Sequence, residues 1–143
     1  MIKEFQKEYR WLSNFAPIEI NLDNFTYPSV EHAYQSKKCK SLYWKDKCSD
    51  TSNSAGYIKK ESKKQIIVHN WDEIKVEIMK VCLEQKFNDP TYKKLLLNTG
   101  DLYIQEGNYW GDKFWGICLK TNTGQNILGH LIMNIRTSLA EKG

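Results

Sequence analysis

The stretch from residue 26 to residue 38 constrains the fold most, because its pattern changes from extended chain to helix within a few residues. Pro28 interrupts the segment that precedes it, and Ser29 is a favourable N-cap residue. We therefore predict a helix that begins near Val30. The extended segment before Pro28 therefore leads directly into the first turn of this helix.

A row of polar side chains on this predicted helix is the first candidate for function. Glu31, Gln35 and Lys38 recur at spacings of four and three residues, so they share one helix face beside Tyr34. Glu31 and Lys38 are two turns apart, about 10 Å of rise, which is too far for an ordinary salt bridge. Their long side chains could still converge on a group over Gln35. An exposed, solvated face explains the spacing equally well.

Length and composition predict one folded domain, residues 1–143. The chain has 143 residues, of which 41% are hydrophobic and 13% aromatic, so it can bury a proper core. Its net charge of +4 is compatible with a polyanionic substrate but is too small for a dedicated DNA-binding tail. We find neither a signal-peptide pattern nor a membrane-length apolar run, and we expect a soluble, cytoplasmic protein with no membrane partner.

The cysteines and histidines do not have the spacing of a metal site. There is no CxxC motif, and the residues are scattered: Cys39, Cys48, Cys82, Cys118, His32, His69 and His130. We expect reduced thiols, no metal and no cofactor. His32 lies off the Glu31 face and is interpreted as a structural hydrogen-bonding residue.

The rest of the chain predicts an α+β fold, predominantly helical, with a small antiparallel β element. The predicted elements are a hairpin (18–22 and 25–27), helices (55–68, 71–87, 91–97 and 123–136) and two extended arms (102–106 and 114–119). Residues 39–54 are interpreted as a loop held by Leu42, Tyr43 and Trp44. The helix at 71–87 is expected to be buried and central. One apolar row is Ile74, Ile78 and Val81, and the adjoining faces hold Val76, Met79, Leu83 and Phe87.

Three segments combine carboxylates, amides, glycines and aromatic side chains beyond what a core requires. They are residues 10–15, 31–38 and 106–116, and the start of the last helix is a fourth contributor. The Trp-Gly pairs of the third segment would let a planar ligand approach the backbone. At the last helix, Thr123 could act as the cap, Gly124 could expose the helix amides to an anion, and Asn126 would lie one turn in. Core anchoring and ordinary capping are the alternatives.

These residues resemble the NADAR family, also called YbiA-like, over nearly the whole chain. The matching segments are residues 11–15 (WLSNF), 27–38 (YPSVEHAYQSKK), 70–71, 79, 86–87, 96–100 (LLNTG), 106, 112, 115–116, 124–129 (GQNILG) and 133–136 (MNIR). Two departures bear on the substrate more than on the fold. They are Cys118, where the family has glycine, and the pair His69 and Asn70, where a basic residue is frequent.

The resemblance implies an N-glycosidase that acts on ribosyl groups and needs no metal. One branch of the family hydrolyses early intermediates of the riboflavin pathway, and another removes ADP-ribose from guanine bases in nucleic acid; we expect the second activity. By motif, the pocket is lined by Asn14, Glu31, Lys38, Trp71, Asp112, Trp115 and Asn126. Arg10, Ser13, Phe15, Gln35, Gly116 and Gly124 are expected to bind substrate beside them.

The chemistry of this reaction fits the candidate residues. Breaking a ribose C1–N bond builds positive charge on the sugar and negative charge on the leaving nitrogen, so two carboxylates, Glu31 and Asp112, are the expected catalytic groups together with Lys38. Arg10 and Arg136 are the only arginines available to grip phosphate. Two other classes stay open: a module that binds ADP-ribose without turnover, and a metal-dependent nuclease using Glu31, Glu106 and Asp112.

Overall fold

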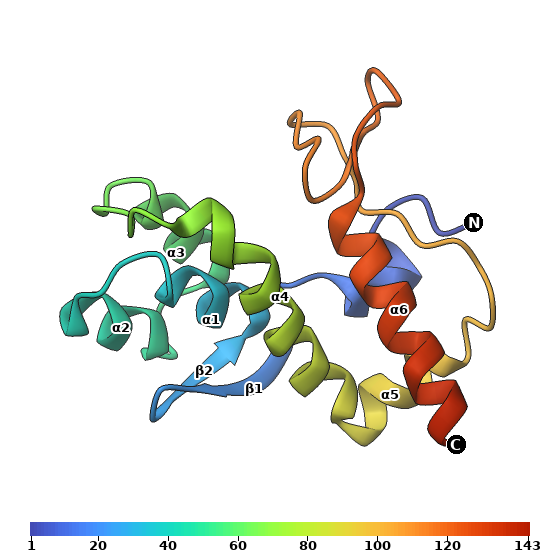
Figure 1. Cartoon of the computed structure of the whole chain (residues 1–143), viewed down its shortest axis with the longest axis horizontal. Coiled ribbons are helices and arrows are strands. Elements are labelled where there is room, and N and C mark those ends of the chain that lie inside the picture. The colour runs from blue at the N-terminus through green and yellow to red at the C-terminus, as the bar shows by residue number, and fades with distance from the viewer. The chain divides into compact units, whose positions relative to one another are not determined.

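The computed structural model describes residues 1–143, which divide into two compact units. The terminal unit consists of Met1–Ser13 and Phe87–Gly143, and the middle unit consists of Asn14–Lys86. The middle unit holds β1, β2 and helices α1 to α3, while both chain ends belong to the terminal unit (Figure 1). Helices predominate and the antiparallel sheet has two strands, so the predicted α+β class is confirmed.

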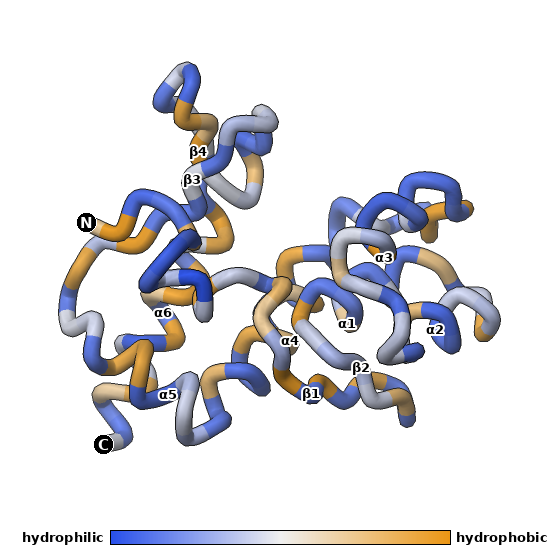
Figure 2. Tube along the Cα trace, turned by 180° about the vertical axis from the view of Figure 1, so that it is seen from behind, coloured by the Kyte–Doolittle hydropathy of each residue, from blue (hydrophilic) through white to orange (hydrophobic).

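The predicted hairpin is present in the middle unit. Strands β1 (Pro17–Leu22) and β2 (Phe25–Ser29) pair antiparallel, and Asp23 and Asn24 form the turn with φ of 51° and 70°. Left-handed backbone at both turn residues matches the twist of the strands, and Asp and Asn adopt it at low cost. Figure 2 shows apolar and polar residues alternating along β1. The second strand runs through Pro28, two residues further than predicted.

Helix α1 (Val30–Ser36) begins where the sequence predicts. The Ser29 hydroxyl accepts a hydrogen bond from the His32 backbone N–H at 3.2 Å, which satisfies one of the free amides of the first turn. All seven residues of the helix are buried. Its neighbours are the hairpin, α2 (Leu42–Ser49) and α3 (Ala55–Ser62), which surround it in the middle unit (Figure 1).

Helix α2 lies in the stretch predicted as a loop, so that interpretation is wrong. Ser41 caps the helix, and Trp44 is its buried anchor, donating its indole N–H to the Gln35 carbonyl oxygen at 2.8 Å. Leu42 and Tyr43, expected to hold the loop down, are 69% and 74% exposed. Of the three residues predicted to hold the stretch in place, only Trp44 is buried, while Leu42 and Tyr43 face solvent.

Helix α3 is shorter than predicted. Helix α4 (Trp71–Asn88) is buried mainly on the predicted adjoining faces, at Met79, Leu83 and Phe87, and less along the row of Ile74, Ile78 and Val81. α3 ends at Ser62, whose hydroxyl donates to the Lys59 carbonyl oxygen, and the apolar residues Ile66 and Ile67 that extended the pattern are exposed. α4 has the predicted bounds to within one residue. Its buried residues are Trp71, Met79, Cys82, Leu83, Lys86 and Phe87, whereas the predicted row is partly exposed.

The terminal unit is built from helices with little sheet. It contains the 3-10 helix η1 (Lys7–Leu12), α5 (Pro90–Leu97) and α6 (Ile127–Lys142), and α5 packs on α6. Of the two predicted extended arms, the first forms only an isolated bridge between Ile104 and Ile2, and the second contains the two-residue strand β4 (Ile117–Cys118). The parallel partner of β4 is β3 (Gly107–Asn108), which follows the first arm. Gly129 allows the backbone of α6 to pack closely, because a Cβ there would collide with the Ile104 carbonyl oxygen.

Two general findings concern the whole chain. No helix has the length and apolar character needed to cross a membrane. All four cysteines are unpaired and buried.

Candidate functional site

Glu31 and Gln35 form a buried polar pair on helix α1. Gln35 Nε2 donates to Glu31 Oε2 at 2.6 Å, and the two residues are 6% and 3% exposed. The shared face predicted from the spacing is therefore real, and the alternative of a solvated face is wrong. A buried carboxylate is costly unless it is paired or used, so this pair is the strongest functional signal in the middle unit.

Asn14 joins this pair through its backbone and side chain. Its carbonyl oxygen accepts the Glu31 N–H at 3.0 Å, and its Nδ2 points at Met79 Sδ at 3.6 Å. Two side-chain oxygens, Asn14 Oδ1 and Gln35 Oε1, are buried without a hydrogen-bond partner. Because most buried polar atoms in proteins are satisfied, these acceptors fit donors supplied by a bound molecule.

Lys38 lies just beyond the end of α1, where its N–H donates to the Gln35 carbonyl oxygen at 3.1 Å. Its Nζ is 3.5 Å from Ser62 Oγ and 5.9 Å from the centre of the Trp71 ring. Burial lowers the pKa of the Lys38 amine below 10.5, and the charge of Glu31 opposes that effect. A lower pKa increases the fraction of neutral amine, which is the form that can act as a nucleophile or base.

Aromatic side chains gather around these polar groups. The Trp71 ring lies 5.1 Å from that of Tyr34, and both residues are buried. The Phe15 ring lies 3.8 Å from the position of a Cβ at Gly56, and its centre is 6.0 Å from Lys59 Nζ. Such surfaces can stack on a base or on the apolar face of a sugar.

His32 has the structural role that the sequence predicts. Its Nε2 is 2.7 Å from the Asn53 carbonyl oxygen, and its Nδ1 is 2.6 Å from Ser29 Oγ. Since a carbonyl can only accept, Nε2 carries the proton and Nδ1 accepts from the serine. Burial lowers the pKa of this imidazole.

The second predicted carboxylate, Asp112, belongs to the terminal unit and shapes a loop there. Its Oδ1 accepts the backbone N–H groups of Phe114 at 3.1 Å and Trp115 at 3.0 Å. Asn108, which the sequence analysis did not single out, is 1% exposed; its Nδ2 donates to Glu106 Oε2 and the Asp112 carbonyl oxygen, while its Oδ1 accepts the Asp112 N–H. Asp112 thus has a structural task, and its catalytic role stays a prediction.

Asn126 is held inside the same unit. It is the N-cap of α6 with φ of 52°, and its side chain accepts from the Glu106 N–H at 2.9 Å and donates to the Ile104 carbonyl oxygen at 2.9 Å. Gly116 is required because a Cβ there would collide with Glu106. Binding of substrate by Asn126, Trp115 and Gly116 stays a prediction.

The anion-binding site predicted at Thr123 and Gly124 depends on a helix that starts there, and that helix start is wrong. The helix begins at Ile127 and not at Thr123, so Asn126 precedes the first turn. The first helix amides are already used, because Ile127 N donates to the Phe114 carbonyl oxygen at 3.1 Å and Leu128 N to that of Trp115 at 2.9 Å. Gly124, with φ of 151°, is needed for close contact with the Gly116 backbone.

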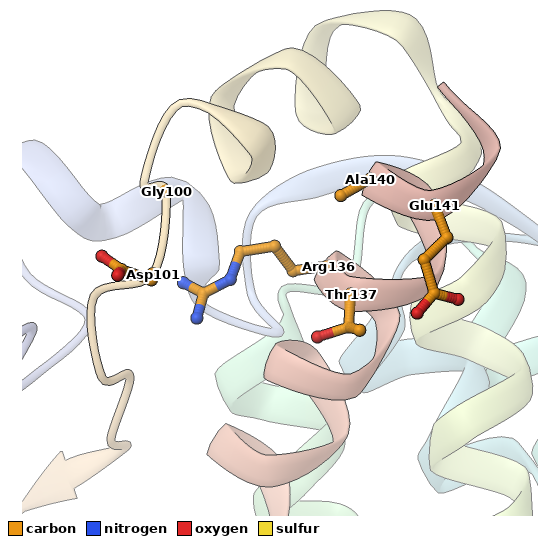
Figure 3. A pocket seen from close by; sticks show the side chains of 6 residues that line it. All are labelled: Gly100, Asp101, Arg136, Thr137, Ala140 and Glu141. Carbon is orange, nitrogen blue, oxygen red and sulfur yellow. The ribbon is translucent and has the colours of Figure 1, made fainter.

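The two arginines differ in availability. Arg136 is 8% exposed and its Nη1 donates to Thr99 Oγ1 and the Leu102 carbonyl oxygen, so it holds the fold together and is not a free phosphate fork. Figure 3 shows Arg136 in a pocket with Asp101 and Glu141, whose carboxylates disfavour an anion. Arg10 is exposed on η1, and the carbonyl of Arg10 accepts the Ser13 N–H. Substrate binding by Arg10 and Ser13 stays a prediction.

The structure therefore groups the predicted residues into two sets. Asn14, Phe15, Glu31, Gln35, Lys38 and Trp71 belong to the middle unit, and Arg10, Ser13, Asp112, Trp115, Gly116, Gly124 and Asn126 belong to the terminal unit. Three further residues escaped the sequence analysis as site candidates: Ser62, Asn108 and Lys86. Lys86 is fully buried and burial lowers its pKa to about 7, which no local sequence pattern could reveal.

Comparison with known proteins places the chain in one family. The NADAR domain matches residues 2–140. A riboflavin biosynthesis protein of Vibrio vulnificus is 31% identical over 141 residues, covering 96% of this chain but only 38% of that protein's length. The N-glycosidase YbiA of Escherichia coli is 30% identical over 140 residues, covering 93% of this chain and 83% of YbiA. The NMR structure of E. coli YbiA superposes with a TM-score of 0.83 at 26% identity, covering 99% of this chain and 88% of that one. This chain is a member of the NADAR family.

Proposed function

We propose that this protein is an N-glycosidase that hydrolyses a bond between ribose C1 and nitrogen. The observation that carries the proposal is the buried Glu31–Gln35 pair near the partly buried amine of Lys38. The similarity to the N-glycosidase YbiA, which extends over most of both chains, supports the same reaction. The two unsatisfied amide oxygens of Asn14 and Gln35 would accept hydrogen bonds from sugar hydroxyls or base N–H groups.

Lys38 supplies the nucleophile in this scheme. Its neutral amine bonds to ribose C1, the C1–N bond breaks, and the bonding electrons leave with the nitrogen, which takes up a proton. Ring opening leaves an imine between Lys38 and the sugar, and water then hydrolyses the imine and restores the amine. Glu31 is the proton donor and acceptor for these steps. Asp112 remains the candidate second carboxylate.

The preferred substrate is ADP-ribose attached to guanine in nucleic acid. A chain with 21 basic and 17 acidic residues is compatible with such a polyanion. The alternative is a glycoside among early riboflavin-pathway intermediates, which the name of the Vibrio vulnificus relative favours. A third possibility is binding of ADP-ribose without turnover.

Mass spectrometry of two parallel reactions separates these substrates. One reaction contains ADP-ribosylated guanine DNA and the other a riboflavin intermediate, and each is run with and without EDTA. Release of unmodified guanine DNA and free ADP-ribose supports the first substrate, whereas cleavage of the intermediate alone supports the second. Retention of the substrate without release of a product would indicate a module that binds ADP-ribose without turnover. Full activity in EDTA would exclude the metal-dependent nuclease; neither unit gathers three metal-ligating side chains.

The covalent step has its own test. Borohydride added during turnover should reduce the imine and leave a ribosyl adduct on Lys38, located by peptide mass spectrometry. Lys38→Arg keeps the positive charge but cannot form the adduct, so we expect it to be inactive. Lys60→Arg, an exposed change on the neighbouring α3, is the control. If the Lys38→Arg protein were active, Lys38 would act only through its positive charge and not as a nucleophile.

A further inference from the structure

A concave site in the middle unit, separate from the Glu31–Lys38 cluster, is formed by four chain segments. It has a volume of about 370 Å³ and is lined from the hairpin turn by Asp23, from the end of α1 by Lys37 and Lys40, from α2 by Lys45, and from the start of α4 by Ile74. This volume falls within the range of small-molecule sites. We call it the Lys45 pocket.

Three ammonium groups face one carboxylate in the Lys45 pocket. Lys37 Nζ forms an ion pair with Asp23 at 2.6 Å, and Lys45 Nζ donates one of its three hydrogens to the Ser36 carbonyl oxygen at 3.0 Å. Lys40 is exposed and takes part in none of the ion pairs of the chain. The pocket therefore keeps an excess of positive charge and unused N–H donors.

The cost of gathering these charges is visible at Lys45. Burial lowers the pKa of the Lys45 amine, and the neighbouring Lys37 charge lowers it further, while Asp23 opposes both. An anion between the lysines would offset the desolvation and the repulsion together. The walls also include Cys39 and Val68, which are apolar and could carry the organic part of a ligand.

We propose that the Lys45 pocket binds the phosphate group of a small phosphorylated ligand. A doubly charged phosphate matches three ammonium groups better than a carboxylate does, and lysine binds phosphate as a point charge. The pocket is distinct from the proposed glycosidase site, because Lys37 reaches Asp23 while the next residue, Lys38, reaches Ser62 and Trp71. The inference is therefore independent of the proposed function.

Isothermal titration calorimetry with three probes tests this assignment. The probes are ribose 5-phosphate, inorganic phosphate and ribose, each titrated at low ionic strength. We expect the two phosphates to bind with Kd of about 1 mM or tighter, and ribose not to bind. Equal affinity for both phosphates identifies free phosphate as sufficient, and tighter binding of ribose 5-phosphate identifies an ester. Binding of ribose alone, or of none of the three, overturns the proposal.

Charge variants locate the site. Lys40→Met should raise Kd about fivefold, and Lys40→Met combined with Lys45→Met at least about tenfold. Asp23→Asn should lower Kd about threefold, because it releases Lys37 from its ion pair. The control Lys60→Met with Lys80→Met removes the same charge from exposed positions elsewhere in the middle unit.

The controls distinguish a site from diffuse attraction. If the control pair weakens binding as much as the pocket pair does, the effect is one of net charge and the pocket is not a site. Lys38→Met should bind phosphate normally even though it removes the proposed nucleophile. Thermal melting of each variant checks folding, and Asp23→Asn keeps the proposal testable should Lys45→Met unfold, since its predicted effect is a gain.

Discussion

Two polar clusters of similar composition serve the molecule differently. The cluster on α1 in the middle unit contains an acid, amides and a lysine beside Trp71, and two of its amide oxygens lack partners. The loop cluster in the terminal unit contains two acids and an amide beside Trp115, and Asn108 there uses both ends of its side chain. The α1 cluster keeps hydrogen-bond acceptors without partners, whereas the side chains of the loop cluster are hydrogen-bonded to the backbone of their own loop.

The difference follows from the local backbone. A helix satisfies its own N–H and C=O groups, so side chains on its face are left for other partners. A loop such as residues 106–116 has no regular ladder, and its amides must be satisfied by side chains such as Asp112. Polar residues on a buried helix are therefore a stronger sign of function than polar residues in a buried loop.

The largest expected effect is on catalysis by Glu31. Glu31→Gln preserves shape and keeps an oxygen that can accept from Gln35, but it removes the acid. We expect turnover to fall by about 10²–10⁴ with little change in melting temperature. The measurement is kcat/KM on whichever substrate is cleaved, together with thermal unfolding.

The matched control for this variant is Glu19→Gln, which removes an exposed carboxylate from β1 of the same unit. It should retain full activity. If the Glu31→Gln enzyme had normal turnover, the α1 cluster would have only a structural role, like the loop cluster.

The next effect is a pH dependence caused by Lys86. Burial lowers its pKa in the folded protein to about 7 from 10.5. Between these values the unfolded chain binds a proton that the folded chain does not, so the free energy of unfolding should rise with pH. The slope is at most about 1.4 kcal/mol per pH unit from this residue. Below the folded pKa the contribution is flat.

Urea unfolding of wild type and Lys86→Met at several pH values measures this term as a difference between the two curves. The curves should diverge by about 2 kcal/mol between roughly pH 7 and pH 9. Lys80→Met, an exposed change on the same helix, should run parallel to wild type. Parallel curves for Lys86→Met would mean that this amine is charged in the folded state.

How much the sequence could predict depended on whether the cause was local. The hairpin and the start of α1 were predictable because Asp23, Asn24 and Ser29 act within a few residues. Helix α2 was not, since Trp44 is anchored by the Gln35 carbonyl oxygen, nine residues away, and only Trp44 and Cys48 of the helix are buried. The start of α6 also depends on distant backbone, because carbonyl oxygens of Phe114 and Trp115 take its first amides.

The sequence predicted which residues form the α1 cluster but not whether their side chains are buried. Spacing placed Glu31, Gln35 and Lys38 on one face but could not decide between a buried and a solvated face. Burial, the unsatisfied oxygens and the lowered pKa of Lys38 arise from packing of α1 against the hairpin and two other helices. The role of Asn108 was likewise invisible, because its partners are backbone groups of a folded loop.

The third prediction tests the structural side of the comparison. Asn108→Ala should reduce the free energy of unfolding by about 2–3 kcal/mol, because it removes the hydrogen bonds that the buried Asn108 side chain makes to Glu106 Oε2 and to the Asp112 backbone. Chemical denaturation measures the loss. Asn134→Ala, an exposed change on α6, should cost nothing. A stable Asn108→Ala protein would show that the loop does not depend on its side-chain network.

The smallest expected effect is the sharpest test of the contrast, because it sets stability against activity at Gln35. Gln35→Met keeps the unbranched shape and removes both the unsatisfied oxygen and the donor to Glu31. Removing a buried oxygen without a partner is favourable, and losing the bond to a carboxylate is unfavourable, so we expect the unfolding free energy to change by less than about 1 kcal/mol. Activity should nevertheless fall about tenfold, because Glu31 loses the group that orients it and the substrate loses an acceptor. Denaturation and kcat/KM on the same sample decide the matter. A variant that unfolds easily but, while folded, cleaves substrate at the normal rate would assign Gln35 to the core, and the α1 cluster would then resemble the loop cluster after all.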